Sequence, residues 1–497
     1  MDATATNPAN LRHPRALYLL FFAELWERFS YYGMRALLVL YLTSQVMEGG
    51  FGYTRENALE IYAVFTGLIY LTPLVGGLLA DKVLGQRKAI FIGGILMMLG
   101  QLSMSYSEFG DLGVRREWLN FGLGLLIVAN GFFKPNISTL VGKLYSENDP
   151  RKDSAFTIFY LGINIGAFIC PYICGTLGEQ VGWSYGFLAA AVGILLGVTI
   201  FFLKHNILGK IGLPPKNPEQ DRLVGRDWLD VLLYVIGCIA LVYGFLALWG
   251  SLGESAKSLI TTVASIAGGA ALLYVIFTNT KGSVQWQRVI VLLVLCFFNV
   301  FFWASFEQAG GTFNLFAAEN TQRQFGSFEI PASWFQSVNS FWIFVLAPFF
   351  SWLWLRLNTI GKNPNIPVKF SIGLLLVGLG FVVMSGATKL ADGGALVSPM
   401  WLISVYLFHT IGELCLSPIG LSMITKLSPA RIVSVMMGLW FASTALGNYL
   451  AGVMESILEN YLPSMHLYDF LTLSSLAAGF ALLLLSPILK RMMGGIS

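Results

Sequence analysis

Residues 24–35 read Glu24-Leu25-Trp26-Glu27-Arg28-Phe29-Ser30-Tyr31-Tyr32-Gly33-Met34-Arg35. They lie inside an apolar run from residue 16 to residue 43, which exceeds the ~20 residues that a helix needs to cross a bilayer. The charged side chains of this stretch fall with Tyr31 within roughly 100° of the helix circumference. A charge at the bilayer centre costs at least ~2.5–3.5 kcal/mol, so such groups face a bundle interior or a wet cavity and pair with one another. The stretch predicts a membrane helix with a functional charged face. An ion pair that serves only packing at a helix end is the alternative.

The composition is typical of polytopic α-helical membrane proteins. Of the 497 residues, 56% are hydrophobic and 12% are charged, whereas a soluble domain carries about 25% charged residues. The net charge of +4 comes from basic residues dispersed among loops, which does not indicate a nucleic-acid-binding protein. The five cysteines lie in apolar segments without a Cys-x-x-Cys pair, so the sequence predicts neither disulfides nor a metal framework.

Apolar runs separated by short polar loops predict fourteen transmembrane helices. The predicted spans are residues 16–45, 57–80, 88–107, 117–143, 154–178, 185–203, 228–250, 257–279, 288–310, 331–355, 369–389, 399–425, 433–459 and 467–489. The longest polar connection, residues 204–227, is proline-rich and reads as a linker. We expect an N-terminal six-helix bundle over residues 1–210, the linker with two inserted helices over 211–281, and a C-terminal six-helix bundle over 282–497.

The distribution of basic residues predicts the orientation. With the N-terminus inside, 22 of the 31 Lys and Arg residues fall in cytoplasmic segments and six in external loops, while Arg28, Arg35 and Lys134 are embedded. An excess of basic residues marks the cytoplasmic loops of membrane proteins. No small-residue cleavage site follows the first apolar run, so we expect a retained helix and not a signal peptide. The prediction is a multi-pass protein of the cell (inner) membrane with both termini cytoplasmic.

Two parts of the chain share a motif. Residues 131–135 and 412–418 each run from glycine to proline, and Lys-Leu follows each proline at the same spacing. Glu27 and Glu307 are separated by nearly the same offset as these two segments. Parallel repeats of six helices, with the substrate site between them near the membrane midplane, are the plan of major facilitator transporters. The predicted fold is therefore an all-α major facilitator fold: two six-helix bundles plus two inserted helices.

Further ionisable residues are embedded in both halves. Lys134 lies mid-span, and Glu307 and Glu413 lie in apolar runs of the C-terminal half. The embedded charges are formally +1 in the N-terminal half and −2 in the C-terminal half. This suits a zwitterion whose carboxylate meets Arg or Lys and whose ammonium meets Glu. For each charge, a structural hydrogen bond to a neighbouring helix is the alternative. Aromatic and amide residues near the charges would give adaptable pockets, with ordinary packing as the alternative: Tyr31, Tyr32, Tyr70, Trp303, Trp440, Asn164 and Asn339.

Carboxylates beside bases in a low dielectric are candidate proton carriers. Burial raises the pKa of a carboxyl group and a nearby cation lowers it, so small movements change its protonation. His409 is as consistent with packing as with function. The loop after the second helix contains Gly76-Gly77, Asp81 and Gly85-x-Arg87-Lys88. Its glycines permit close helix approach, and Asp81 and Arg87 could pair and separate as the bundle moves. A positively charged cytoplasmic loop with a turn glycine is the alternative.

These residues resemble the proton-dependent oligopeptide transporters (POT) of the major facilitator superfamily. The matching motifs are Glu24-x-x-Glu27-Arg28-Phe29-x-Tyr31-Tyr32-Gly33, Gly131-Phe132-Phe133-Lys134-Pro135-Asn136, Phe156-Thr157-Ile158-Phe159-Tyr160-Leu161-Gly162-Ile163-Asn164-Ile165-Gly166, Trp303 with Glu307-Gln308, the segment from Ser333 to Asn339, and Gly412-Glu413. The resemblance runs over almost the whole chain, and the two inserted helices are similar to the prokaryotic branch. The chain departs from the family pattern at Ser340, where many relatives have proline, and at the bulky Phe306, which could narrow the pocket.

The resemblance implies roles for the matching positions. Arg35 and Lys134 would hold the carboxylate of a peptide, and Glu413 would hold its amino terminus with help from Asn164 and Asn339. The implied proton-coupling network consists of Glu24, Glu27, Arg28, Lys134 and Glu307. The implied side-chain pockets are lined by Tyr31, Tyr32, Tyr70, Trp303 and Trp440, and the implied gating loop contains Asp81 and Arg87.

We expect a proton-coupled symporter that imports di- and tripeptides by alternating access. It would work as a monomer, with protons as the coupling ion and without a cofactor or metal. A carrier of the same fold for another small solute, an amino-acid derivative or an anion, is the alternative. Loss of Glu413 separates the two, because an anion carrier should tolerate it. A membrane enzyme that uses Glu24 and Glu27 as acid and base would need a nucleophile, metal cluster or phosphate-binding loop, and the sequence offers none.

Overall fold

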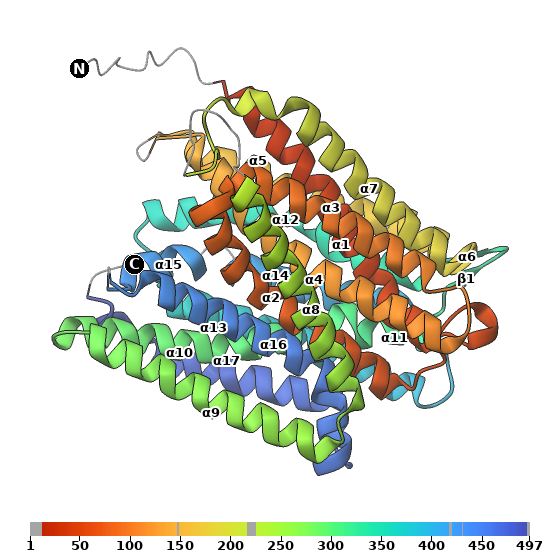
Figure 1. The fold of residues 1–497 in the computed structure, drawn as a ribbon. Coiled ribbons are helices and arrows are strands. Elements are labelled where there is room, and N and C mark those ends of the chain that lie inside the picture. Colours follow the sequence, from red (N-terminus) through yellow and green to blue (C-terminus); the bar gives the residue numbers. More distant parts are fainter. Residues whose placement is uncertain (1–11, 147–148, 216–224, 417–419, 430, 495–497) are drawn as a thin grey trace. The chain divides into compact units, whose positions relative to one another are not determined.

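The computed structural model (Figure 1) describes residues 12–146, 149–215, 225–416, 420–429 and 431–494. The chain divides into two compact units. Unit 1 comprises residues 1–34 and 72–243, and unit 2 comprises residues 35–71 and 244–497. Helices α1 (Arg15–Thr43), α2 (Arg55–Leu79) and α8 (Gly225–Ser251) each contribute residues to both units.

Unit 1 is built around α3 (Gly85–Tyr106), which packs against α4 (Leu112–Lys143) and α7 (Trp183–Lys204). The unit also contains α5 (Lys152–Cys170), α6 (Thr176–Gln180), π-helical turns at Ala80–Leu84 and Pro171–Gly175, and a 3-10 turn at His205–Leu208. Helix α4 begins after Asp111, whose carboxylate accepts hydrogen bonds from the backbone N–H groups of Gly113 and Val114. This is a helix N-cap, which stabilises the first turn.

Glycines bring the helices of unit 1 into close contact. A Cβ on Gly166 of α5 would lie 2.4 Å from the carbonyl oxygen of Leu25 on α1, and one on Gly193 of α7 would lie 2.4 Å from a ring of α1. A Cβ on Gly76 of α2 would lie 2.0 Å from the carbonyl oxygen of Gly131 on α4. The close helix approach predicted for the glycine pair after the second helix is therefore confirmed at Gly76.

Unit 2 is a second helical bundle in which α13 packs against α14 and α17, and α10 packs against α16 (Figure 1). Its α-helices are α9 (Glu254–Asn279), α10 (Ser283–Phe306), α11 (Thr312–Asn320), α12 (Ser337–Thr359), α13 (Ile366–Ala391), α14 (Met400–Leu416), α15 (Gly420–Leu427), α16 (Val433–Tyr461) and α17 (Leu467–Met492). It also contains 3-10 turns at Val46–Glu48, Glu307–Gly310 and Ala332–Gln336, and an antiparallel hairpin of β1 (Gln324–Phe325) and β2 (Phe328–Glu329).

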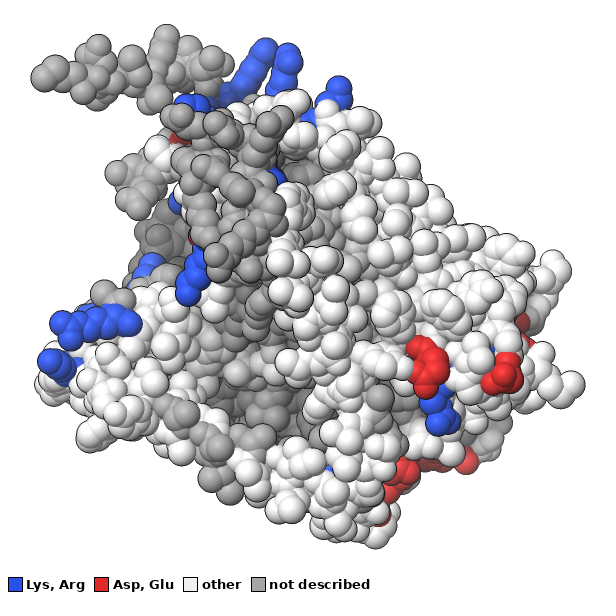
Figure 2. Space-filling view, viewed as in Figure 1, with Lys and Arg blue, Asp and Glu red and all other residues white. Residues whose placement is uncertain are grey.

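Helical structure occurs in every one of the predicted spans, which confirms the all-α architecture. Among the described residues, seven helical segments are long and apolar enough on their own to cross a membrane. Figure 2 shows that uncharged residues cover most of the visible face, with few Lys, Arg, Asp or Glu side chains between them. The count of fourteen membrane crossings stays a prediction, as do the three predicted domain boundaries.

The structure departs from the predicted spans where helices break. The fifth predicted helix is interrupted by a π-helical turn that begins at Pro171, because proline lacks the N–H that would continue the α-helical hydrogen bonds. Helix α10 ends at Phe306, so Glu307 lies in a 3-10 turn and not inside the predicted helix. Helix α11 and the β1–β2 hairpin were not predicted. Two segments singled out from the sequence, the proline of the second motif copy at 417–419 and the linker residues 216–224, lie outside the described residues.

Candidate functional site

A buried cluster of opposite charges lies on one face of α1 in unit 1. The Nε atom of Arg28 is 2.8 Å from Glu24 Oε1 and 2.6 Å from Glu27 Oε2. Only the contact with Glu24 has hydrogen-bond geometry, and both carboxylate oxygens of Glu27 are buried without a hydrogen-bond partner among the described residues. Two carboxylates share one guanidinium, so the cluster carries a formal charge of −1 where burial makes charge expensive. Such a site favours a second cation nearby, and the Lys134 ammonium group of α4 interacts with Glu27.

Further predicted residues of unit 1 extend this cluster. Lys134 of α4 is half-buried and interacts electrostatically with Glu27. The Arg28 guanidinium lies 5.7 Å from the centre of the Tyr31 ring, and Tyr32 packs edge-to-face on Tyr31 with centroids 5.1 Å apart. The structure therefore brings these residues together with Glu24. Asn164 of α5 is buried in the same unit, and its amide donates to the carbonyl of Tyr160 one turn earlier, at 2.9 Å.

Unit 2 contains a network that joins Arg35 to Glu307 across 272 residues of sequence. Arg35 Nη2 lies 2.6 Å from Glu307 Oε2, and the two side chains are 9% and 6% exposed. Arg35 Nε donates to the Tyr62 hydroxyl at 2.9 Å, and that hydroxyl donates to Glu307 Oε2 over a long 3.5 Å. Gly310 leaves space for the Tyr62 hydroxyl, because a Cβ at this position would lie 2.0 Å from the Tyr62 oxygen. The network ties the α1 segment of unit 2 to the end of α10.

Glu413 of α14 has a partner that fixes its orientation. Asn339 Nδ2 donates to Glu413 Oε2 and to Thr410 Oγ1, both at 3.0 Å. The Thr410 hydroxyl donates to the carbonyl of Tyr406 at 2.7 Å. The lone pairs of the Thr410 oxygen therefore point toward the Asn339 amide. Glu413 is half-buried, so its carboxylate is both oriented and partly accessible. This arrangement can hold a ligand ammonium group.

The predicted pocket aromatics of unit 2 lie in three helices. Trp303 lies in the last turn of α10, four residues before Glu307. Its ring meets the Phe306 ring edge-to-face, with centroids 5.6 Å apart. Trp440 of α16 is buried and edge-to-face to another ring at 6.4 Å. Tyr70 on α2 is half-buried. Trp303 is thereby placed beside the Glu307 network, and the pocket roles of the three residues stay predictions.

The predicted gating loop has polar partners within unit 1. Asp81 accepts a hydrogen bond from Gln86 at 2.7 Å. Arg87 is buried and donates to the carbonyl oxygens of Gly209 and Ile211 at 2.5 and 2.6 Å. Gly85 has a φ of 71°, which favours glycine at this turn. Arg87 therefore ties the loop to the segment that follows α7.

Asp149 lies outside the membrane helices and is not a candidate proton carrier. Hydrogen bonds from the Arg151 side chain, at 2.7 and 3.0 Å, and from its backbone N–H lower the pKa of Asp149 to about 2. The stabilisation from this ionised group is complete above the ordinary Asp pKa of about 3.9 and is lost only as pH falls toward 2. The carboxylates embedded in the membrane helices remain the candidate proton carriers.

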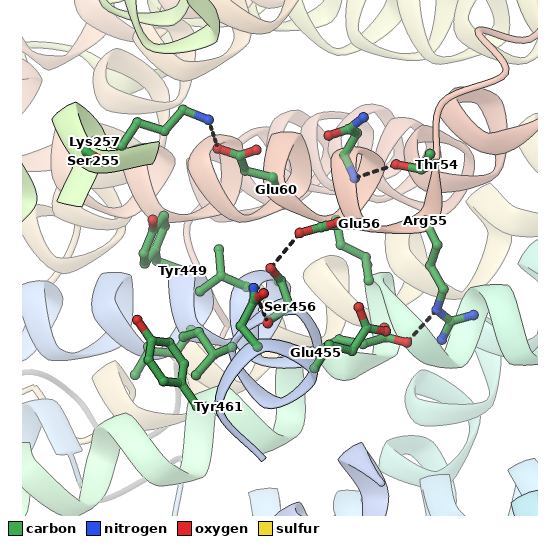
Figure 3. Close-up of a pocket in the computed structure, with 18 of the residues that line it drawn as sticks. Thr54, Arg55, Glu56, Glu60, Ser255, Lys257, Tyr449, Glu455, Ser456 and Tyr461 are labelled. Atoms are coloured by element: carbon green, nitrogen blue, oxygen red, sulfur yellow. Dashed lines mark hydrogen bonds and ion pairs between the residues drawn. The ribbon is translucent and has the colours of Figure 1, made fainter. Parts of the chain in front are cut away.

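A polar cavity of about 1120 Å³ also lies in unit 2, between α2, α9 and α16. Figure 3 shows the polar and charged side chains that face it from these helices. Around this cavity, Lys257 pairs with Glu60 at 2.7 Å, Arg55 pairs with Glu455 at 2.8 Å, and the Ser456 hydroxyl donates to Glu56 at 2.7 Å. The first of these attaches the inserted helix α9 to α2. None of the site residues predicted from the sequence lines this cavity.

Tyr62 and Thr410 complete the two networks of unit 2 and were not predicted from the sequence. Both lie in apolar runs, and a threonine hydroxyl in a helix is commonly satisfied by a carbonyl of its own helix, as Thr410 is. The only available signal was a polar group in a membrane span, and it does not identify a distant partner. Within the described ranges, no three His, Cys, Asp or Glu side chains gather closely enough to hold a metal ion.

Comparisons with known proteins find relatives along nearly the whole chain. The family model described as "PTR2: POT family" matches residues 87–467. Peptide transporter YePEPT of Yersinia enterocolitica subsp. palearctica is 38% identical over 98% of this chain and 98% of its own length. The di-/tripeptide transporter of Lactococcus lactis subsp. cremoris is 34% identical over 96% of each chain.

Solved structures extend this likeness to three dimensions. The crystal structure of peptide transporter POT in complex with sulfate is 35% identical, covers 97% of this chain and 96% of its own, and superimposes with a TM-score of 0.84. This match confirms the predicted all-α major facilitator fold of a multi-pass membrane protein. The family model covers more than half of the chain, and both relatives exceed 30% identity over almost their full length. The chain therefore belongs to the POT family of transporters.

Proposed function

We propose that this protein is a proton-coupled symporter that imports di- and tripeptides by alternating access. The observation that carries the proposal is the buried ion pair between Arg35 and Glu307, because its carboxylate can exchange a guanidinium partner for a proton. Relatives named peptide transporter and di-/tripeptide transporter support the substrate class. Membership in a transporter family sets the enzyme alternative aside.

Peptide binding would use the embedded charges predicted from the sequence. Glu413, oriented by Asn339, would hold the peptide ammonium group. Lys134 and Arg35 would hold the peptide carboxylate, with Asn164 as an additional donor. In this structure Arg35 is engaged by Glu307, so it becomes available to a peptide carboxylate when Glu307 is neutralised. The aromatic residues at 31, 32, 70, 303 and 440 would line the side-chain pockets.

Proton coupling would follow from competition for Arg35. Protonation of Glu307 removes the negative charge that holds the guanidinium, so the network with Tyr62 loosens. The peptide carboxylate can then replace Glu307 as the partner of Arg35. Release of the peptide returns Arg35 to Glu307 and expels the proton. The cluster of Glu24, Glu27 and Arg28, near Lys134, would provide a second group of sites that respond to charge in unit 1.

The driving force is large enough for concentrative uptake. One charge that crosses a membrane potential of ~100 mV provides ~2.3 kcal/mol. A pH difference of about one unit adds ~1.36 kcal/mol. Together these would concentrate a neutral solute several hundredfold, on the order of 500-fold at 1.4 kcal/mol per decade. Protons then suffice as the coupling ion, without a cofactor.

The protein would be a monomer in the cell (inner) membrane. The excess of basic residues in alternate loops supports a cell (inner) membrane protein with both termini cytoplasmic. Asp81 and Arg87 would act as a gating loop at the cytoplasmic turn after α2.

The substrate class is tested by uptake of labelled dialanine into proteoliposomes with an inward proton gradient. We expect di- and tripeptides to compete, and single amino acids and inorganic anions not to. Glu413→Gln should weaken competition by peptides with a free amino terminus and leave N-acetylated peptides unaffected. If folded wild-type protein shows no peptide uptake, the other-solute alternative replaces this proposal.

A further inference from the structure

His409 of α14 is a buried ionisable side chain that the proposed transport cycle does not use. It is 2% exposed, and three phenylalanine rings of unit 2 surround it. The ring centroids are 6.2 Å from Phe306, 5.6 Å from Phe313 and 4.9 Å from Phe381. Favourable aromatic pairs have centroids about 4.5–7 Å apart. The imidazole therefore stands in an aromatic cage formed by α10, α11 and α13.

Packing holds the imidazole in this cage. Gly380 of α13 leaves the space that the ring occupies, because a Cβ there would lie 2.5 Å from His409 Cδ2 and 2.7 Å from Nε2. The buried Nε2 atom has no hydrogen-bond partner within the described part of the chain. A buried polar atom without a partner is rare in proteins and calls for an explanation.

Phe306 connects this cage to the Glu307 network. It is the last residue of α10 and directly precedes Glu307. Its ring stacks on Phe302 with centroids 5.6 Å apart and an interplanar angle of 15°. Trp303 meets the same ring edge-to-face. Phe306 is half-buried, and its ring contacts Phe302 and His409, so a movement of Phe306 changes the packing of both rings.

His409 in turn lies on the same helix face as Glu413, four residues further along α14. Between them, Thr410 accepts a hydrogen bond from the Asn339 amide that also binds Glu413. A displacement of α14 at His409 is therefore carried to the Glu413 carboxylate, since a helix transmits movement as a stiff element. Glu307 and Phe306 are neighbours in the sequence, the rings of Phe306 and His409 stack on each other, and His409 lies one helical turn before Glu413.

We propose that Phe306 and His409 are positioning residues that couple the protonation of Glu307 to the placement of Glu413. Loss of the Arg35 pair frees the end of α10, Phe306 moves with it, and His409 passes the displacement to α14. This inference rests on the proposed proton-coupled peptide transport. Coupling between two sites changes affinity by about 5- to 150-fold in typical proteins.

Simple core packing leads to a different expectation. If the rings only fill space, truncation of Phe306 lowers folding stability and every transport mode together. If they couple the two sites, truncation lets peptide cross without its proton. Accumulation driven by a proton gradient then falls, while counterflow exchange at equal pH, which needs no net proton movement, is kept.

The test compares Phe306→Ala and His409→Phe with wild type in proteoliposomes. We expect Phe306→Ala to lower gradient-driven dialanine accumulation about tenfold, equivalent to about 1.4 kcal/mol of lost coupling. Its counterflow rate should stay near that of wild type. His409→Phe keeps a ring in the cage and should accumulate dialanine normally. Phe297→Ala is the matched control, because Phe297 lies on the same helix but is 58% exposed.

Each other outcome overturns the proposal. Equal loss of accumulation and counterflow in Phe306→Ala would identify a packing role. Loss of coupling in His409→Phe would assign the effect to the imidazole proton and not to ring contact. Should Phe306→Ala elute as aggregate, Phe306→Leu, which keeps volume without the ring, takes its place. Failure of the wild type to accumulate dialanine would refute the proposed function. Normal gradient-driven accumulation by Phe306→Ala would refute only this inference.

Discussion

Glu307 lies at the point where two distant segments of the chain meet. Its carboxylate is bound by Arg35 and lies within reach of the Tyr62 hydroxyl, and all three side chains are buried. A buried ion pair is a weak source of stability, but breaking it by removing one partner is strongly destabilising. The pair is therefore suited to a switch, because a proton can neutralise the carboxylate without leaving an unpaired negative charge.

The Arg35–Glu307 pair gives a prediction for folding stability. Arg35→Ala leaves the Glu307 carboxylate buried without its cation and should lower stability by about 3–5 kcal/mol. The double variant Arg35→Ala with Glu307→Gln should be less destabilised than Arg35→Ala alone, because no unpaired charge remains. Thermal unfolding in detergent measures the series at one pH. Additive effects of the two substitutions would contradict the buried pair.

Asn339 gives a prediction for substrate affinity. Asn339→Ala removes the amide that orients Glu413 and binds Thr410. Hydrogen bonds to charged groups contribute about 1.5–3 kcal/mol, so we expect KM for dialanine to rise about tenfold or more at unchanged maximal rate. The matched control is Asn299→Ala, which removes an amide that binds Ser443 and Thr444 in the same unit. Should both variants raise KM equally, Asn339 has no special role in binding.

At the scale of elements, glycine positions determine which helices touch. A Cβ on Gly452 of α16 would lie 2.5 Å from the Ala63 Cβ and 2.6 Å from the Leu59 carbonyl oxygen, both on α2. Backbone atoms cannot yield as a flexible side chain does. Gly452 therefore lies at a close approach of α2 and α16 within unit 2, and it lines the pocket of Figure 3.

Two alanine substitutions test this contact with opposite expected signs. Gly452→Ala should destabilise the protein by about 1–3 kcal/mol, the usual cost of overpacking. Gly268→Ala in α9 should be neutral or stabilising by up to about 1 kcal/mol through helix propensity, because an added Cβ there would meet no atom of another described element within 4 Å. Melting temperatures of the purified variants decide the question. Equal melting temperatures would show that α2 and α16 are not closely packed.

The elements also show what the sequence predicts and what it does not. Long apolar runs determine that a segment is helical, so each predicted span contains a helix. The ends of helices depend on local backbone chemistry and tertiary contacts, which explains the missed break at Pro171 and the 3-10 turn at Glu307. At the candidate site, the pairing of Arg28 with Glu24 was predictable from the sequence, because both residues lie on one helix face. The pairing of Arg35 with Glu307 could not be predicted from the sequence. The two residues are 272 positions apart, and periodicity carries no information about distant partners.

At the scale of the whole molecule, the embedded charges are distributed over both units. Glu24, Glu27, Arg28 and Lys134 belong to unit 1, and Arg35, Glu307 and Glu413 belong to unit 2. Residues 35–71 belong to unit 2, and Arg35 pairs there with Glu307. Helix α1 thus contributes charged side chains to each unit.

The proposed orientation is tested by cysteine labelling in intact cells. Asp392→Cys lies in a predicted external loop and Asn363→Cys in a predicted cytoplasmic loop, and both positions are exposed. We expect a membrane-impermeant maleimide to label the first in intact cells and the second only after permeabilisation, as the excess of basic residues inside predicts. The unsubstituted protein is the control for its five native cysteines. The reverse labelling pattern would contradict the orientation.

The most direct test of the central claim is gradient-driven dialanine uptake by wild type and Glu307→Gln in the same proteoliposomes. Wild type should concentrate the peptide well above equilibrium, up to several hundredfold at about one pH unit and ~100 mV. Glu307→Gln should keep counterflow exchange and lose accumulation, because its side chain can no longer take up and release a proton. Undiminished accumulation by Glu307→Gln would contradict the claim that the Arg35–Glu307 pair couples protons to transport.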